Sequence, residues 1–458
     1  MKINKDGSGT FSAGFRRSLI ALVIPIAFQN LISAAVNSAD IVMLSNVGQS
    51  VMSAVSLAGQ ITFVLMLFYA GLAIGTGILT AQYWGKNNTM AIKRVLSIAC
   101  IFSVIVSFLF FIASIVFPDS LMHIFTNDEE LIMYGVKYQR SLSFSYLAMS
   151  LSQMYLAMVK SMEKTHFSAI VSSAGLILNI LLNALCIFVL FKGDPEMTII
   201  GVAAATVIAR FFELACCFIH SLHSGNVRFS LPIRDNVQKL LLHDYLRYTI
   251  PVLANYVVYG GALAASIAII GHVSSDMVAA NAIINVVKNL ATVLCNGIGV
   301  GGSILVGKYL GSQDIQFAKK AGIKIYKYAL GFGVLAGITI LAMKPLIFIL
   351  VNINIIAQGY LNLMLFVCAF WSIGKSLNST IIGGIFPAGG DAKFGFLCDV
   401  IVMWGIIIPL SLVCAFIWHV QPVILYIVIC SDEFIKMPVA LIRFRQYRWL
   451  NNITRDFK

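Results

Sequence analysis

The sequence predicts an all-α polytopic membrane protein with twelve transmembrane helices in two six-helix lobes related by an internal repeat. Three observations predict this class. Of the 458 residues, 59% are hydrophobic and 11% are charged, whereas a soluble domain carries about 25% charged residues. Apolar runs of about 20 residues, the length that crosses a bilayer as a helix, recur along the whole chain. A spaced glycine motif from the first half also returns in the second half at a fixed offset.

The apolar runs place the twelve predicted spans. The first run is too long for the core of a signal peptide, so we interpret it as a retained helix. The expected spans are 18–44, 51–80, 92–117, 131–159, 167–191, 198–220, 244–271, 277–307, 318–343, 357–385, 394–418 and 421–442. They predict an N-terminal segment (1–17), an N lobe (18–220), an inter-lobe linker (221–243), a C lobe (244–443) and a tail (444–458).

Lysine and arginine gather on alternate connections between these spans. One side holds the basic N-terminus, the basic linker, the tail and residues such as Lys86, Lys93, Arg94, Lys160, Lys164, Lys308, Lys319 and Lys320, while the other holds Lys192, Lys344 and the acidic stretch 127–130. By the positive-inside rule, both termini are expected to be cytoplasmic in a cell (plasma or inner) membrane. The net charge of +13 therefore reflects orientation in the bilayer rather than a nucleic-acid partner.

The repeat aligns the two halves of the chain at an offset of 226 residues. The stretches "GLAIGTGILTAQYWGKNN" (71–88) and "GIGVGGSILVGKYLGSQD" (297–314) share Gly71/Gly297, Gly75/Gly301, Ile78/Ile304, Leu79/Leu305, Tyr83/Tyr309 and Gly85/Gly311, and 297 − 71 = 226. The same offset aligns Pro25 with Pro251. Because each lobe has an even number of spans, the lobes keep one orientation and are related by an axis along the membrane normal. Spaced glycines favour close helix packing.

Asp40 is the only charged residue between Arg17 and Lys86. A charged side chain at the centre of a membrane helix costs about 2.5–3.5 kcal/mol on insertion scales, and such residues usually face a cavity or a proton relay. Burial disfavours the ionised form, so the group is expected to gain and lose a proton near physiological pH. The structural alternative is a neutral carboxyl group hydrogen-bonded to Asn37 or to a neighbouring helix.

The remaining patterns give no sign of catalysis. The nine cysteines lack metal-type or redox-type spacing, and the seven histidines form no triad or metal pattern. Gly374-Lys375-Ser376 lacks the earlier glycine of a phosphate-binding loop and lies inside an apolar run. We therefore expect no enzyme activity, no cofactor and no metal centre, and transport that is driven by an ion gradient or runs downhill.

Several stretches together resemble MATE (multidrug and toxic compound extrusion) transporters, in a bacterial, DinF-like form. They are "AVNSADIVMLSNVG", "GLAIGTGILTAQYWGKNN", "LILNILLNALCIF", "GVAAATVIAR" and "GIFPAGGDAKFGFLCDVIVMWGIIIPL". The resemblance covers nearly the whole chain. It implies two lobes that export small organic, cationic molecules in exchange for H⁺ or Na⁺. It also implies an ion-coupling site at Asp40, Asn179, Asn183 and Thr206, where Na⁺ would bind if it is the coupling ion.

Three departures from the family pattern bear on the site. Asn183 stands where some members have a second acid, which favours H⁺ over Na⁺. Spans 7 and 10 lack the acid that forms a C-lobe cation site in other branches. Phe386-Pro387 replaces Leu-Arg before the turn at Gly389, Gly390 and Asp391, so we expect the turn to persist without its arginine contact.

Other intramembrane residues have several interpretations. Lys288 and Lys375 are charged C-lobe residues; we hypothesise that Lys288 faces a central cleft, with a structural pairing as the alternative. Tyr256, Met66 and Tyr155 are candidates for the wall of a substrate cleft, although packing is the default role of such residues. Arg210 and Glu213 are expected to form a local pair, and Asp432, Glu433 and Lys436 an inter-lobe polar cluster.

The predicted function is a monomeric secondary antiporter with Asp40 as the coupling carboxylate. The first alternative is a flippase for lipid-linked precursors from the same superfamily, for which Lys288 and Lys375 would supply a cationic cavity. The second is a membrane enzyme or receptor, which the twofold repeat disfavours.

Overall fold

A computed structural model describes residues 8–224, 228–230, 235–350 and 354–457 of the chain. In this part of the chain every regular element is a helix. The first half contains α1 (Ser8–Ser45), α2 (Gln49–Gly85), α3 (Thr89–Val116), α4 (Pro118–His123), α5 (Glu129–Ser143), α6 (Ser145–Ser161), α7 (Thr165–Leu185), η1 (Cys186–Leu190) and α8 (Pro195–His223).

The second half begins with α9 (Asn236–Val273), α10 (Ser275–Gly311) and α11 (Ile315–Leu350). It continues with α12 (Ile355–Thr380), η2 (Ile381–Ile385), α13 (Phe386–Ala388), α14 (Ala392–Asp399), η3 (Val400–Ile407), α15 (Ile408–Leu412), η4 (Val413–Ile417), α16 (Pro422–Cys430) and α17 (Asp432–Arg445). The predicted linker is shorter than expected, because α8 and α9 extend into it and leave only 224–235 between them.

The helices confirm a polytopic membrane protein. Ten helical segments of the described chain are long and apolar enough to cross a bilayer, and the pair α5 and α6, bent by 49°, makes an eleventh. The expected twelfth span corresponds to α16 and α17. It falls outside this count because it is broken near Ser431 and carries Asp432, Glu433 and Lys436.

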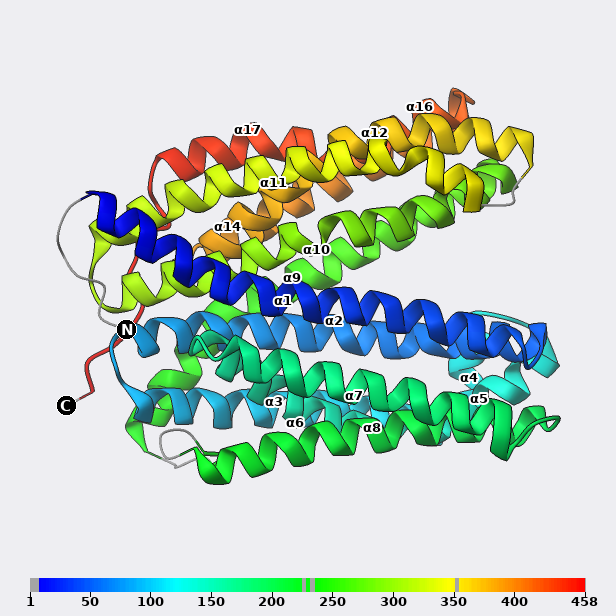
Figure 1. Cartoon of the computed structure of the whole chain (residues 1–458), viewed down its shortest axis with the longest axis horizontal. Coiled ribbons are helices and arrows are strands. Elements are labelled where there is room, and N and C mark those ends of the chain that lie inside the picture. The colour runs from blue at the N-terminus through cyan, green and yellow to red at the C-terminus, as the bar shows by residue number, and fades with distance from the viewer. Residues whose placement is uncertain (1–7, 225–227, 231–234, 351–353, 458) are drawn as a thin grey trace.

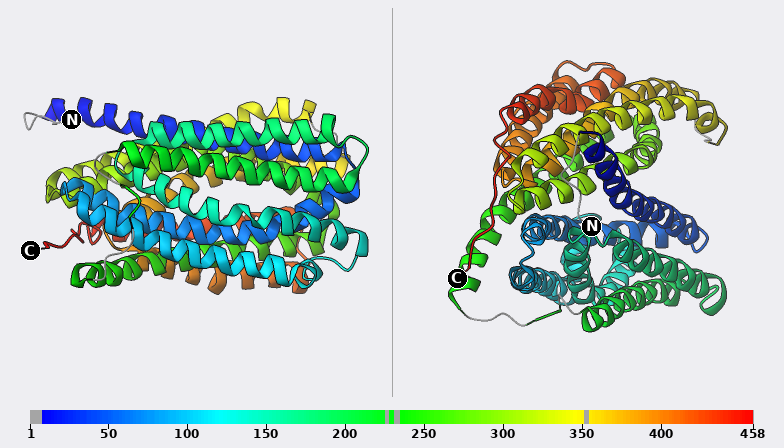
Figure 2. Two further views of the ribbon diagram at one scale, coloured as in Figure 1. Left: turned by 90° about the horizontal axis from the view of Figure 1, so that it is seen from below. Right: turned by 60° about the vertical axis from the view of Figure 1, so that its left-hand side comes forward.

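The two halves of the chain form two groups of long, roughly parallel helices (Figures 1 and 2). α1 begins and the described C-terminal segment ends at the same end of the molecule (Figure 1), as an even number of spans requires. We call this the terminal end. Its orientation relative to the cytoplasm is a prediction from the charge pattern.

The glycines of the sequence repeat form the contact between the lobes. A Cβ at Gly85 would lie 2.0 Å from the Lys308 carbonyl oxygen, and a Cβ at Gly311 would lie 1.8 Å from the Gln82 carbonyl oxygen. These contacts are reciprocal under the 226-residue offset, because 85 + 226 = 311 and 82 + 226 = 308. Only a residue without a side chain allows the α2 and α10 backbones to approach this closely.

The same reciprocity continues towards the middle of the molecule. Gly75 of α2 lies against Thr249 of α9, and its repeat mate Gly301 of α10 lies against Val23 of α1, where 23 + 226 = 249. The lobes therefore meet along one pseudo-twofold seam, α2 on α9 and α1 on α10. We call the Gly85–Lys308 and Gly311–Gln82 contacts, near the terminal end, the glycine seam.

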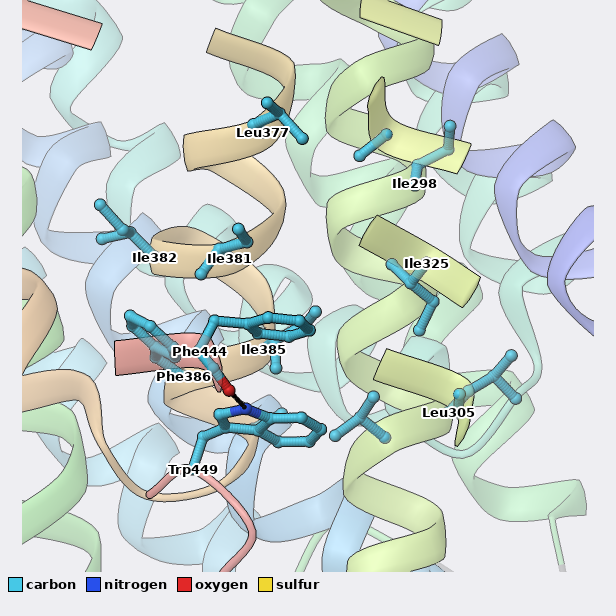
Figure 3. Packing of buried hydrophobic residues seen from close by; sticks show 14 of the residues in the cluster. Ile298, Leu305, Ile325, Leu377, Ile381, Ile382, Ile385, Phe386, Phe444 and Trp449 are labelled. Carbon is cyan, nitrogen blue, oxygen red and sulfur yellow. Dashed lines mark hydrogen bonds between the residues drawn. The ribbon is translucent and has the colours of Figure 1, made fainter. Parts of the chain in front are cut away.

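The C-terminal tail crosses the terminal end of both lobes. Trp449 is fully buried against α17, donates its indole N–H to the Phe444 carbonyl oxygen (3.1 Å) and anchors the start of the tail (Figure 3). Beyond it, the Gln82 side chain of α2 donates to the Asn451 carbonyl oxygen (3.1 Å) and accepts from the Ile453 N–H (2.9 Å). We call Asn451–Phe457 the terminal strap.

The strap ends in ion pairs to both lobes. Arg455 donates to both carboxylate oxygens of Asp244 on α9 (2.5 and 2.7 Å), and Lys86 of α2 pairs with Asp456 (2.5 Å). Asp244 is 4% exposed and Arg455 is 41% exposed on their side chains. The bidentate pair therefore covers a buried carboxylate with a half-exposed guanidinium group.

The Arg455–Asp244 pair gives a testable expectation. Arg455→Ala leaves the buried Asp244 carboxylate without its partner and is expected to cost about 1–2 kcal/mol, less than a fully buried pair because solvent reaches the guanidinium. Thermal unfolding of the purified protein in detergent measures this loss. The matched control is Arg448→Ala, an exposed arginine just before the strap. Equal melting temperatures for the two variants would contradict a holding role for the strap.

Candidate functional site

Asp40 lies on α1 and accepts a hydrogen bond from the amide of Asn183 on α7 (Oδ1 to Nδ2, 3.0 Å). One helical turn earlier on α7, the amide of Asn179 donates to the hydroxyl of Thr206 on α8 (3.1 Å). Helix positions four apart share one face, which is why both asparagines point to the same side. The fold thus brings the four residues that the resemblance implies into one cluster inside the N lobe.

The cluster contains one oxygen without a partner. Asn183 is 2% exposed, and its Oδ1 atom has no hydrogen-bond partner among the described residues. A buried polar atom of this kind is costly unless a ligand or ion can use it. The Asn37 side chain, the alternative partner of Asp40, lies outside the described residues. Among those described, no group of three or more His, Cys, Asp or Glu residues has the arrangement of a metal centre.

A cavity of about 460 Å³ lies between the lobes. Asn30 of α1 and Ile74 of α2 contribute its N-lobe wall, and most of the remaining wall comes from the C lobe. Asp40 is ten residues beyond Asn30 on the same helix, which corresponds to about 15 Å along the helix axis. α1 therefore connects the cavity wall with the Asp40 cluster.

The C-lobe wall of this cavity is a network of charged and amide side chains. Lys436 of α17 pairs with Asp399 of α14 (2.8 Å) and with Asp432 one turn earlier (3.0 Å). The second carboxylate oxygen of Asp399 accepts from the amide of Asn255 on α9 (2.8 Å). We call the full set the C-lobe network; it comprises Asn255, Lys375, Asn378, Asp399, Asp432, Glu433 and Lys436.

The other half of the network is centred on Glu433. Its Oε2 atom accepts from the amide of Asn378 on α12 (2.8 Å), and its Oε1 atom is 3.2 Å from the Lys375 ammonium. Lys375 also donates to the hydroxyl of Tyr259 (2.7 Å). All these bonds are made within the C lobe.

This arrangement corrects the prediction of an inter-lobe cluster at Asp432, Glu433 and Lys436. The three residues are buried, and their partners are on α12 and α14, not on the N lobe. Asp399 and Asn255 also belong to the site, although no sequence prediction named them. The available signal was Asp399 itself, a lone acid in the apolar stretch "FGFLCDVIVMW", since ionisable groups in such stretches are seldom without a role.

The structure separates the five predicted cleft residues. Tyr256 and Lys375 line the cavity. Met66 packs against the hydrophobic core of the N lobe, and Tyr155 is fully buried and bonds to His220 (2.8 Å). Tyr155 therefore packs inside its lobe and lines no cleft.

Lys288 is also enclosed in the C lobe. Its ammonium lies 4.4 Å from the ring centroid of Trp371 and 4.9 Å from that of Tyr426, with the Cys430 sulfur at 3.5 Å. Aromatic faces attract a desolvated cation. Lys288 therefore has the structural pairing that was the alternative, with aromatic rings as partners instead of a carboxylate. It does not line the cavity described above, so the hypothesis that it faces the cleft is not supported.

Two smaller expectations can be checked directly. Arg210 and Glu213 form the predicted local pair (2.9 Å). The turn at Gly390 persists, with a φ of 79°, but its arginine contact is present after all. Arg443 of α17 binds both carboxylate oxygens of Asp391 (2.8 and 3.0 Å). The arginine missing before the turn is supplied by a residue 52 positions later.

Comparison with known proteins identifies the family. A family model described as MatE matches residues 25–185 and 251–413. The chain belongs to the MatE family. The two matched segments begin 226 residues apart (251 − 25), the same offset as the glycine repeat. MatE proteins are membrane transporters, which confirms that the chain is a transporter and not an enzyme.

Relatives of known sequence and structure agree with this assignment. The MatE chain is 24% identical over 439 residues to the uncharacterized transporter YisQ of Bacillus subtilis, covering 94% of this chain and 95% of YisQ. It is 25% identical over 447 residues to a probable multidrug resistance protein NorM of Thermotoga maritima, covering 95% and 93%. A MATE family transporter of the MOP superfamily, solved in an outward-facing conformation, superimposes with a TM-score of 0.86 at 16% identity, covering 97% and 98%.

Proposed function

We propose that this MatE protein is a secondary antiporter that exports small organic, cationic molecules in exchange for H⁺, with Asp40 as the coupling carboxylate. The observation that carries the proposal is the lone carboxylate of Asp40 in the N lobe, hydrogen-bonded to the Asn183 amide (3.0 Å) and joined through α1 to the central cavity. The multidrug names of several relatives agree with an exporter of small organic molecules.

H⁺ is favoured over Na⁺ by the composition of the cluster. Asp40 supplies its one carboxylate, and the other members are the amides of Asn179 and Asn183 and the hydroxyl of Thr206. A cluster with a single negative charge is neutralised by one proton. If Na⁺ is instead the coupling ion, the same four side chains would be its ligands, with the unpartnered Asn183 Oδ1 among them.

Coupling follows from the position of α1. This helix contributes Asn30 to the cavity, carries Asp40 and packs on both α7 and α10. Protonation removes the charge of Asp40, and the altered contact with α7 changes how α1 lies against the cavity and the C lobe. A proton and a cationic substrate therefore favour different positions of one helix, which is the requirement for exchange.

The charge pattern assigns the terminal end to the cytoplasm. The glycine seam and the terminal strap hold the lobes together at this end. In that orientation the structure corresponds to a state closed towards the cytoplasm. Transport then requires the seam and the strap to open when the cavity turns inward.

Efflux from vesicles tests the proposed function. Proteoliposomes loaded with ethidium are placed in a pH gradient, a Na⁺ gradient or neither, and the fluorescence of the dye follows its exit. We expect efflux with the pH gradient alone. If efflux requires the Na⁺ gradient alone, then Na⁺ and not H⁺ is the coupling ion. If neither gradient moves ethidium or another organic cation, the protein is not an antiporter of this class.

One observation favours a second candidate, a flippase for lipid-linked precursors. Lys375 and Lys436 give the cavity wall two cationic side chains, which suit the anionic headgroup of such a lipid. In the vesicle assay a flippase would move a fluorescent phospholipid analogue between leaflets and leave ethidium in place.

A further inference from the structure

The accessible charge on the C-lobe wall of the cavity is a cation. The Lys375 side chain is 21% exposed, whereas the Glu433, Lys436 and Asp432 side chains are 1%, 2% and 5% exposed. Asp399, at 9%, has its two oxygens occupied by Lys436 and Asn255. Of the charged side chains in this network, that of Lys375 is therefore the most accessible from the cavity.

Glu433 only partly satisfies Lys375. The two groups form an ion pair in which Lys375 Nζ and Glu433 Oε1 are 3.2 Å apart, longer than the contact of the same ammonium with Tyr259. The one hydrogen bond that the ammonium makes there goes to the hydroxyl of Tyr259 (2.7 Å). A lysine ammonium has three donors; Tyr259 takes one and the ion pair with Glu433 engages a second, which leaves one for a ligand in the cavity.

The whole network nevertheless carries a surplus of negative charge. Its three carboxylates (Asp399, Asp432, Glu433) face two ammonium groups (Lys375, Lys436), which leaves one negative charge when all five are ionised. This surplus would repel a purely anionic molecule at longer range. In a molecule that carries both charges, the cationic group is attracted by the surplus and the anionic group can accept a hydrogen bond from Lys375.

We propose that the cavity binds an amphiphilic zwitterion and that the Lys375 ammonium binds its anionic group, a carboxylate or a similar oxyanion. This inference rests on the proposed function and narrows its substrate class from organic cations to molecules with both charges. The rings of Tyr256 and Tyr259 and the side chains of Ile74, Val252 and Ile382 line the same cavity and suit a flat apolar body.

A matched pair of dyes tests the proposal. Rhodamine B carries a cationic ring system and a carboxylate, and its methyl ester keeps the ring and loses the negative charge. Fluorescence anisotropy of each dye with the full chain in phosphatidylcholine nanodiscs gives the two dissociation constants without any ion gradient. We expect rhodamine B to bind about tenfold more tightly than the ester, the effect of one charge-assisted hydrogen bond.

Lys375 variants assign this preference to one residue. Lys375→Met should bring the two dissociation constants together, and Lys375→Arg should keep them apart. The double variant Lys375→Met/Glu433→Gln removes both charges, so it avoids leaving Glu433 buried without a counter-ion if the single variant fails to fold. The control is Lys344→Met, which removes a C-lobe ammonium that lies over Phe366 and outside the cavity wall.

The outcomes separate the inference from the antiporter. Equal affinity of the native protein for both dyes, or a preference for rhodamine B that survives in the double variant, which lacks the charges of Lys375 and Glu433, would overturn the role of Lys375. If the Lys375–Glu433 pair were purely structural, the Lys375 variants would bind both dyes more weakly to the same extent, which would also overturn that role. The dye assay measures binding at equilibrium and does not depend on an ion gradient. The role of Lys375 can therefore be refuted while gradient-driven efflux is observed, and the antiporter can be refuted while the dye preference is observed.

Discussion

Asp40→Asn is expected to reduce gradient-driven efflux to the level of protein-free vesicles. Asparagine has nearly the same shape, and its carbonyl oxygen can still accept the hydrogen bond from Asn183 (3.0 Å in the native protein). The variant therefore keeps the packing of α1 on α7 but cannot bind and release a proton. The measurement is ethidium efflux under an imposed pH gradient, together with thermal unfolding to show that the fold is intact.

The matched control for this change is Asp119→Asn, the same substitution at an exposed position of α4. It should leave efflux unchanged. If Asp40→Asn transports as well as the control, then the carboxylate is structural and another group must couple the ion. The C-lobe network, with three carboxylates, would be the next place to test.

Gly311→Val is expected to prevent closure of the terminal end and to stop transport. Its Cβ would lie 1.8 Å from the Gln82 carbonyl oxygen and 2.5 Å from the carbonyl carbon. These are backbone atoms of α2 and cannot rotate away, so the two helices must separate. Alternating access needs both ends to close in turn, and a protein held open at one end cannot complete the cycle.

The separation can be measured between Asn87 and Gln313, repeat mates in the turns that follow α2 and α10 (87 + 226 = 313). Spin labels at these positions, with the other accessible cysteines replaced, report the distance across the seam. Gly311→Val should lengthen this distance and abolish efflux. Gly331→Val, at a position where a Cβ meets nothing within 4 Å, is the control. Native distance and native transport in both variants would refute the role of the seam.

The seam shows how far a sequence repeat can be taken. The offset of 226 aligned Gly85 with Gly311 and predicted two lobes related by one axis. It did not indicate that Gly85 packs on Lys308 and Gly311 on Gln82, two partners that are themselves repeat mates. That reciprocity depends on which faces of α2 and α10 meet, and apolar runs in a membrane helix do not define a face, because both lipid and protein interior are apolar.

The Asp40 cluster could be predicted from the sequence for a different reason. A single acid among 67 uncharged neighbours (18–85, apart from itself) is visible in the sequence, and the family motifs placed Asn179, Asn183 and Thr206 beside it. In the C-lobe network only Asp399 gave such a signal. The other members of the network come from α9, α12 and α17, and each alone is compatible with a local pair or a helix end.

The sequence by itself determined the membrane class, the positions of the helices, the repeat and the isolation of Asp40. These properties depend on composition and on residues close together in the chain, where hydrophobicity and charge act directly. Only the tertiary structure decided that Lys375 faces the cavity, that Lys288 is enclosed by aromatic rings and that the tail fastens the terminal end. Those outcomes depend on contacts between helices up to hundreds of residues apart, and close packing of the whole bundle selects them.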